Sequence, residues 1–110
     1  MAAPVKGDVV VVPIPFSDLT QAKRRPAFIL ATPPGDDVIL CQITSQSIRD
    51  ACAVPLEDAD FEQGGLKQTS NVRPNRLFTA DRRIILYRIG SLKREKQAAV
   101  TETVVAILRR

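Results

Sequence analysis

Arg25 and Thr44 are the two residues whose chemistry stands out in this 110-residue chain. Arginine stays charged at any ordinary pH, and its planar guanidinium donates two parallel hydrogen bonds to the oxygens of a phosphate or a carboxylate. A threonine hydroxyl can donate a further hydrogen bond to the same group. The pair therefore suits charge stabilisation at an anionic centre better than proton abstraction, because a guanidinium that keeps its proton is a poor general base.

Most other catalytic chemistries lack their residues in this sequence. There is no histidine, which rules out paired histidines as general acid and base as well as a Ser-His-Asp set. There is no glycine-rich phosphate loop either. Two cysteines with carboxylates alone would make an unusual metal site, so Cys41 and Cys52 are expected to be buried free thiols. We therefore predict neither a metal nor a cofactor.

Two predicted strands bring the arginine and the threonine together. Residues 26–32 and 38–44 are apolar runs, and residues 33–37, Pro-Pro-Gly-Asp-Asp, have the composition of a turn between antiparallel neighbours. Arg25 lies about as far before this turn as Thr44 lies after it. We therefore expect the guanidinium and the hydroxyl to share one rim of the sheet.

The other predicted strands are shorter. Residues 8–12 form a valine-rich strand, and because Pro13 and Pro15 follow it, this strand should bend or lie at a sheet edge. Gly90 and Ser91 are expected to end the last strand. The remaining strands are predicted at residues 51–56, 71–73 and 84–89, with an acidic loop between the first two of these.

From Leu92 onward the apolar spacing becomes helical, and Ser91 is the predicted N-cap. The apolar face of this helix comprises Val100, Val104, Ile107 and Leu108. Several short strands followed by one helix predict a mainly β fold: a small, strongly bent antiparallel sheet or barrel with one C-terminal α-helix. The length favours a single domain over residues 1–110.

The charge distribution favours an anionic partner without identifying it. The formal net charge is +4 and the sequence pI is about 9.5. Acidic residues concentrate at positions 36–37 and 57–62, which leaves excess positive charge around residues 23–25, 73–76 and 82–96. No apolar run of about 20 residues is present, and no signal sequence precedes the first strand, so we expect a cytoplasmic protein without a membrane segment.

Each residue of the pair also has a simpler interpretation. Arg25 fits a solvated cation at a strand edge that discourages aggregation, and Thr44 and Ser45 fit a strand end with ordinary hydroxyl-to-backbone hydrogen bonds. On spacing alone the simpler interpretation is preferred for each residue, and only the combination points to a site.

The order of several short motifs resembles the MazF/PemK family of toxin ribonucleases. That family shows an early Gly-Asp strand, a polar loop, a Lys-x-Arg-Pro strand and a later strand ending in Thr or Ser. The matching segments here are Gly7-Asp8, Lys23-Arg24-Arg25-Pro26, Ile43-Thr44-Ser45-Gln46, Gly65-Leu66-Lys67, Ser70-Asn71-Val72-Arg73 and Leu77-Phe78-Thr79-Ala80-Asp81. The resemblance covers nearly the whole chain.

This resemblance implies a CcdB/PemK-like, Src-homology-3-like barrel that works as a homodimer. It also implies a toxin of a type II toxin–antitoxin system, with metal-independent, sequence-selective cleavage of single-stranded RNA. The expected partners are then RNA and a cognate antitoxin whose acidic segment mimics RNA phosphates. In the cleavage reaction the 2′-hydroxyl of the RNA attacks the adjacent phosphate, so the protein need not supply a nucleophile.

The resemblance assigns Arg25 as the catalytic arginine and Thr44 as the catalytic hydroxyl residue. Other members use a histidine in the first loop or an aspartate after the later arginine. Here that loop offers Ser17, Asp18 and Thr20, and Asn75 stands near the place of the aspartate, so the proton acceptor stays open. The candidate RNA-binding residues are Phe16 for base stacking, Lys23 and Arg24 for phosphates, Ser17, Gln46 and Asn75 for base edges, with Ser45 and Arg73 beside them.

Two other hypotheses share parts of this pattern. A CcdB-like toxin would bind a protein target such as gyrase without cleaving RNA, but residues 106–110 do not clearly supply the C-terminal helix motif that this requires. A plain RNA-binding barrel would interleave more aromatic residues with its basic ones than a 5% aromatic content allows. Fold alone cannot separate these hypotheses from cleavage.

Overall fold

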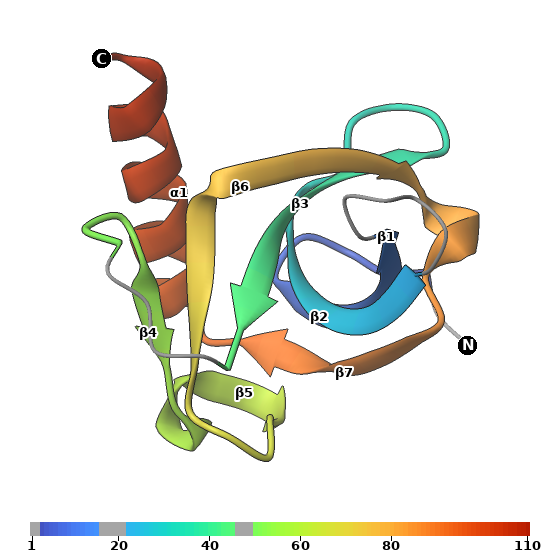
Figure 1. The fold of residues 1–110 in the computed structure, drawn as a ribbon, viewed down its shortest axis with the longest axis horizontal. Helices are drawn as coiled ribbons and strands as arrows, with labels where there is room; N and C mark the ends of the chain where they lie inside the picture. The colour runs from blue at the N-terminus through green and yellow to red at the C-terminus, as the bar shows by residue number, and fades with distance from the viewer. Residues whose placement is uncertain (1–2, 16–21, 46–49) are drawn as a thin grey trace.

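The strands form one curled antiparallel sheet with a helix on one side (Figure 1). The computed structural model describes residues 3–15, 22–45 and 50–110. The sheet order is β4-β6-β3-β2-β1-β7-β5. The elements are β1 (Asp8–Pro15), β2 (Ala22–Ala31), β3 (Asp37–Thr44), β4 (Val54–Leu56), the 3₁₀ turn η1 (Asp58–Asp60), β5 (Phe61–Gly64), β6 (Ser70–Asp81), the 3₁₀ turn η2 (Arg82–Ile84), β7 (Tyr87–Leu92) and α1 (Arg94–Leu108). The predicted mainly β fold with a C-terminal helix is confirmed.

Both faces of the sheet carry a hydrophobic core. Successive side chains of a strand point to opposite faces, so neighbouring residues such as Val9 and Val10 enter different clusters. The first cluster includes Phe28 and Cys41 of the sheet and Val100 and Val104 of α1. The second consists of Val10, Val12, Ala27, Ile29, Val38 and Leu40. Continuous apolar runs fit strands that are buried on both faces.

The predicted hairpin is confirmed, whereas β1 lies inside the sheet, between β2 and β7, and not at its edge. β2 and β3 pair as antiparallel neighbours. β1 continues through Pro13 and Pro15, and its pairing with β7 ends at Val11, so within the described residues these prolines are paired with β2 alone. Their missing N–H groups therefore cost β1 little there.

The last strand and the helix start differ from the prediction. β7 begins at Tyr87 rather than Ile84, and Gly90 and Ser91 belong to it instead of ending it. The N-cap of α1 is Lys93, so the assignment of Ser91 was wrong. Close approach of β5 explains Gly90: a Cβ atom there would lie 2.2 Å from the Gln63 carbonyl oxygen. Glycine is needed for packing rather than for a break.

Replacing Gly90 with alanine is therefore expected to destabilise the fold by about 3 kcal/mol, since the new methyl group meets backbone that cannot rotate away. Urea unfolding followed by circular dichroism measures this. Gly65→Ala is the control, because its Cβ would meet only the Asp58 side chain, at 3.1 Å from Oδ1. Equal midpoints for Gly90→Ala and the parent protein would refute the close-approach argument.

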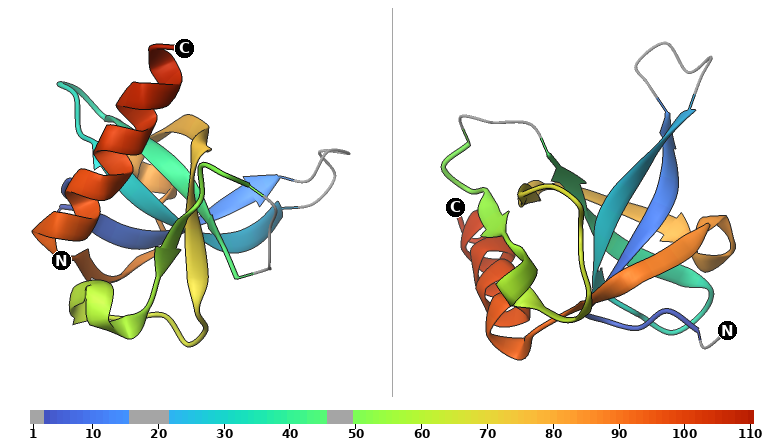
Figure 2. Two further views of the ribbon diagram at one scale, coloured as in Figure 1. Left: turned by 90° about the vertical axis from the view of Figure 1, so that its left-hand side faces the viewer. Right: turned by 90° about the horizontal axis from the view of Figure 1, so that it is seen from below.

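Helix α1 lies at one side of the curled sheet and η2 at the other (Figure 2, right). Val100 and Val104 are buried as predicted, whereas Leu108 is 70% exposed and does not belong to the apolar face. Lys96 links the helix to the sheet, with Nζ 3.5 Å from Asp60 Oδ1 and donating to the Pro55 carbonyl at 3.1 Å. Among the described residues, no helix is long and apolar enough to cross a membrane.

Both cysteines are free thiols. Cys41 is buried in the first core cluster, and burial raises the pKa of its thiol to about 12. Cys52 is half-buried rather than buried as predicted. A thiol as deeply buried as Cys41 is a packing group and not a nucleophile.

Candidate functional site

The register of β2 and β3, extended beyond its last pair, aligns Arg25 with Thr44. Ala27 pairs with Gln42 and Phe28 with Cys41. Continuing this register by two residues along each strand, from Ala27 back to Arg25 and from Gln42 on to Thr44, puts these two positions opposite one another. Cβ atoms at opposite positions of an antiparallel pair lie about 5 Å apart. On this extension Arg25 and Thr44 share one rim of the sheet, and a contact between them stays a prediction.

Arg25 and Thr44 lie on the face that carries the second core cluster. In steps of two, Arg25 shares its face with Ala27, and Thr44 shares its face with Leu40. On its other side β2 pairs with β1, and there Arg25 lies opposite Val12, which is fully buried. Arg25 is half-buried at the end of an apolar cluster, where charge interactions are stronger than in open water.

Arg73 joins this face from β6. It pairs with Gln42, the residue two positions before Thr44 in β3. Cys41 of β3 pairs with Leu77 of β6, but the next residue, Gln42, pairs with Arg73. The three residues of β6 between Arg73 and Leu77 therefore have no partner in β3. These residues form the corner of β6 visible in Figure 1. Asn75 lies within that corner and is exposed.

Asp50 holds Arg73 in place. Arg73 Nη2 donates to Asp50 Oδ2 at 3.3 Å, and the Cys52 N–H donates to Asp50 Oδ1 at 2.9 Å. The hydrogen bond from Cys52 lowers the pKa of Asp50 most, and Arg73 and a hydrogen bond from Asn75 add to it against the opposing effect of burial. With 11% of its side chain exposed, Asp50 is a shielded, ionised partner of Arg73.

A groove of about 620 Å³ opens beside Arg25. Its described lining includes three cations and no carboxylate: Arg24, Arg25 and Lys67. Ser45 also lines it, whereas Lys23 is exposed on β2 and does not. The structure thus brings Arg24, Arg25 and Ser45 to one groove. The predicted residues Phe16, Ser17 and Gln46 lie outside the described residues, as do Asp18 and Thr20.

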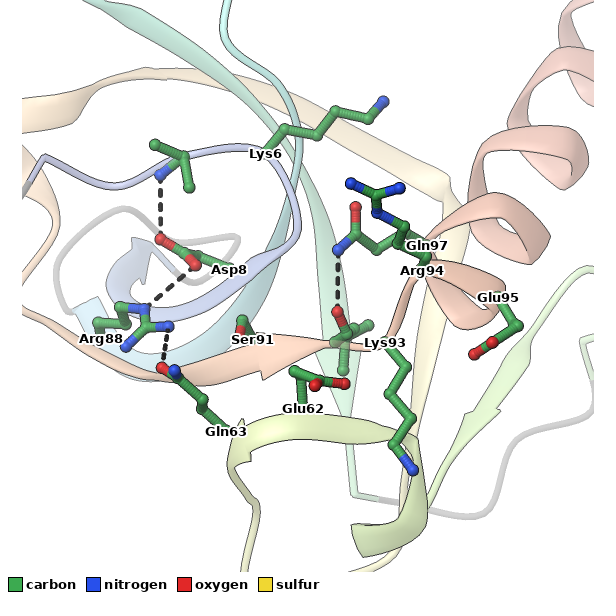
Figure 3. A pocket seen from close by; sticks show the side chains of 12 residues that line it. Lys6, Asp8, Glu62, Gln63, Arg88, Ser91, Lys93, Arg94, Glu95 and Gln97 are labelled. Atoms are coloured by element: carbon green, nitrogen blue, oxygen red, sulfur yellow. Dashed lines mark hydrogen bonds and ion pairs between the residues drawn. The ribbon is translucent and has the colours of Figure 1, made fainter.

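A second groove, of about 600 Å³, has a different electrostatic character (Figure 3). Asp8, Glu62 and Glu95 line it together with basic residues, so its charges are largely balanced. Asp8 Oδ1 lies 3.1 Å from Arg88 Nε, and Asp8 Oδ2 accepts the Val5 N–H at 3.0 Å. The Gly7-Asp8 motif therefore serves the fold, by tying the N-terminal turn to β7.

In the described part of the chain, no three His, Cys, Asp or Glu side chains are grouped closely enough to hold a metal ion. The sequence did not predict three residues: Asp50, which pairs with Arg73, and Lys67 and Tyr87, which line the groove beside Arg25. Lys67 lies within a segment that the family resemblance had singled out. Asp50 and Tyr87 carried no motif signal.

Residues 5–108 match the model of a known protein family, described as PemK-like, MazF-like toxin of type II toxin–antitoxin systems. The chain belongs to this family. The match spans β1 through the end of α1, so it includes every described residue of the candidate site. No curated protein matches the sequence of this toxin.

Solved structures of similar fold carry related names. The chain is 24% identical to the Mycobacterium tuberculosis toxin MazF-mt6, with a TM-score of 0.72 and coverage of 93% of this chain and 96% of the other. MazF from Deinococcus radiodurans is 19% identical, with a TM-score of 0.79 and full coverage of both chains. An endoribonuclease in complex with its cognate antitoxin from a mycobacterial species is 14% identical, with a TM-score of 0.77 and coverage of 97% and 96%. At these identities the likeness shows the fold.

Proposed function

We propose that this toxin is a metal-independent endoribonuclease that cleaves single-stranded RNA at selected sequences. The observation that supports the proposal most is the β2–β3 register, which aligns Arg25 with Thr44 when it is extended by two residues beyond its last pair, Ala27 and Gln42. Arg73 lies on the same face and brings a second guanidinium. Family membership and the name of a structural neighbour as an endoribonuclease support the same activity.

In the proposed reaction, the 2′-hydroxyl oxygen of one nucleotide attacks the adjacent phosphorus, and the bond from phosphorus to the 5′-oxygen of the next nucleotide breaks. The 2′-hydroxyl loses its proton, and the leaving 5′-oxygen gains one. The products are a 2′,3′-cyclic phosphate and a 5′-hydroxyl. The protein must hold this in-line geometry and stabilise the charge that develops on the phosphate oxygens.

Arg25 takes the stabilising role, because its fork of donors matches two phosphate oxygens. Thr44 donates a hydrogen bond to the same phosphate. Arg73 adds a second cation, and the ion pair with Asp50 fixes its direction. Because its pKa is lowered, Asp50 is a weak proton acceptor, which favours a positioning role for its carboxylate over that of general base.

The partners follow from the same surfaces. We propose that an acidic segment of a cognate antitoxin binds the carboxylate-free groove and so competes with RNA. Similar folds have been solved as MazE–MazF complexes from Deinococcus radiodurans. We also propose that the toxin works as a homodimer in the cytoplasm, where its RNA substrates lie.

Lys23 and Arg24 are proposed to bind neighbouring RNA phosphates. Changing both to glutamine is expected to weaken RNA binding and to lower the slope of log K against log salt by about 1.4, since each contact to single-stranded RNA contributes about 0.7. Titration of a labelled oligomer at several salt concentrations measures the slope. Arg109 and Arg110, both exposed, provide the matched control pair. An unchanged slope in the Lys23 and Arg24 variant would refute the assignment.

The proposed activity is tested by incubating the purified protein with a long single-stranded RNA in EDTA and mapping the fragment ends. Discrete cuts at a shared short sequence are expected. RNA that stays intact at every enzyme concentration would contradict the proposal and favour a CcdB-like toxin with a protein target or a plain RNA-binding barrel.

A further inference from the structure

The groove beside Arg25 has an aromatic wall that the proposed reaction does not use. Tyr87 of β7 pairs with Val11 of β1, and Val11 pairs with Pro26 of β2. Paired positions share a face, so these three residues form a row across three strands. All three line the groove, and Tyr87 is 48% exposed. A large aromatic side chain is thus presented to solvent on the face that Arg24 and Pro26 share, which is opposite to the face of Arg25 and Thr44.

The chemistry of this groove fits a nucleotide. Val11, Pro26 and Ile89 give it an apolar floor, and Arg24, Arg25 and Lys67 add positive charge without a carboxylate among the described lining residues. The groove of similar volume in Figure 3 has three carboxylates and no aromatic residue in its lining. A nucleobase stacks on an aromatic ring, while its phosphate needs cations that are not already neutralised.

We propose that Tyr87 is the stacking platform for the base of a nucleotide that flanks the cleaved one, where the RNA passes the rim at Arg25 onto the opposite face of the sheet, with Arg24 and Lys67 on that nucleotide's phosphate. This rests on the proposed function, because it takes single-stranded RNA as the ligand. A volume of about 620 Å³ lies within the range of sites that enclose a ligand of nucleotide size, which is about 300 to 1,000 Å³.

The composition of the chain allows a direct test. Tyr87 is the one tyrosine of the sequence, and there is no tryptophan, so intrinsic tyrosine fluorescence reports this single side chain. The unaltered protein is titrated with ten-nucleotide 2′-O-methyl oligomers of adenosine, cytidine or uridine, which cannot be cleaved because the attacking hydroxyl is blocked. Inorganic polyphosphate serves as the phosphate-only probe, and binding of each probe is followed separately by competition with a labelled oligomer.

We expect saturable quenching of the tyrosine emission by at least one oligomer and little change with bound polyphosphate. Equal quenching by polyphosphate would overturn the proposal, since it would report charge rather than stacking. Bound oligomers that leave the emission unchanged would also overturn it, as would the absence of any oligomer binding. If the tyrosine emission per molecule falls as the protein concentration rises in the absence of RNA, the ring lies in a contact between two copies of the protein. That result would also reject the assignment.

Two variants separate the ring from the fold. Tyr87→Phe keeps an aromatic ring and should bind the oligomers as the parent does, whereas Tyr87→Leu keeps apolar bulk and should bind them about 10- to 100-fold more weakly. Thermal unfolding verifies that both variants fold. If the parent protein cleaves RNA and Tyr87→Leu binds and cleaves it equally well, the stacking inference fails while the proposed function stands. If no cleavage occurs while the oligomers still quench the emission, the proposed function fails and the stacking site stands.

Discussion

Arg25→Ala is expected to slow RNA cleavage about 10²- to 10³-fold, the loss typical when one donor that stabilises transition-state charge is removed, or about 3 to 4 kcal/mol. The reason is geometric: Arg25 pairs with the buried Val12 and aligns with Thr44 on the extended register, whereas Lys23, on the same face of β2, lies two residues farther along the strand. Single-turnover cleavage of a mapped RNA site measures the rate without interference from product release.

This prediction has two controls. One variant keeps the positive charge at position 25, and the other removes an arginine that lies away from the site. Arg25→Lys keeps a cation but loses the two-donor fork, so a partial loss of rate is expected. Arg83→Ala removes an exposed arginine whose side chain is 82% exposed and pairs with Asp81, and it should cleave at the parental rate. A folded Arg25→Ala protein that cleaves RNA as fast as the parent would reject the assignment of the site.

Asp50→Asn is expected to reduce the cleavage rate on the order of 10- to 100-fold, because a small misplacement of a group that contacts the reacting phosphate has effects of that size. The asparagine keeps an acceptor for the Cys52 N–H but loses the charge that holds the Arg73 guanidinium. The pair should be coupled, so adding Asp50→Asn to Arg73→Ala should cost much less than it costs alone.

The pH dependence of this effect follows from the lowered pKa of Asp50. A carboxyl group with a lowered pKa in the folded protein contributes its ion pair above the ordinary aspartate range, and the contribution is lost only as the pH falls through the lowered value. The ratio of parental to Asp50→Asn rates should therefore be constant between about pH 5 and pH 8. A ratio that rises or falls steeply within that window would indicate proton transfer by Asp50 instead of positioning.

Asp81 provides a matched control for Asp50. It also pairs with an arginine, with Arg83 Nη2 at 2.7 Å from its Oδ2, and hydrogen bonds from Arg83 lower its pKa to about 2. It lies opposite Asp37, at the end of β3 away from Thr44. Asp81→Asn should therefore leave cleavage unchanged. Similar losses in both variants would mean that Asp50 acts on stability and not on the site.

The part of the fold that local chemistry determines was predictable from the sequence. The turn at residues 33–37 and the apolar runs beside it defined the β2–β3 hairpin, and equal spacing from the turn placed Arg25 near Thr44. The resemblance to the family then assigned the pair. These features depend on neighbours along the chain, which composition and periodicity report well.

The features that depend on distant segments were missed. β5 lies in a stretch expected to be an acidic loop, because Phe61 is its one buried residue. β6 is far longer than residues 71–73, since its corner breaks the alternation. Asp50 meets Arg73 across 23 positions, and Tyr87 reaches the groove through a register shift between β1 and β7. No local pattern encodes such contacts, because tertiary packing sets them.

The most direct test of the central claim compares two RNA oligomers in EDTA, one entirely of ribonucleotides and one with a single 2′-deoxyribonucleotide on the 5′ side of the mapped cut. The account predicts cleavage of the first, with a 2′,3′-cyclic phosphate and a 5′-hydroxyl at the new ends, and no cleavage of the second at that position. Equal cleavage of both oligomers would contradict attack by the 2′-hydroxyl, and intact RNA in both would contradict the proposed ribonuclease.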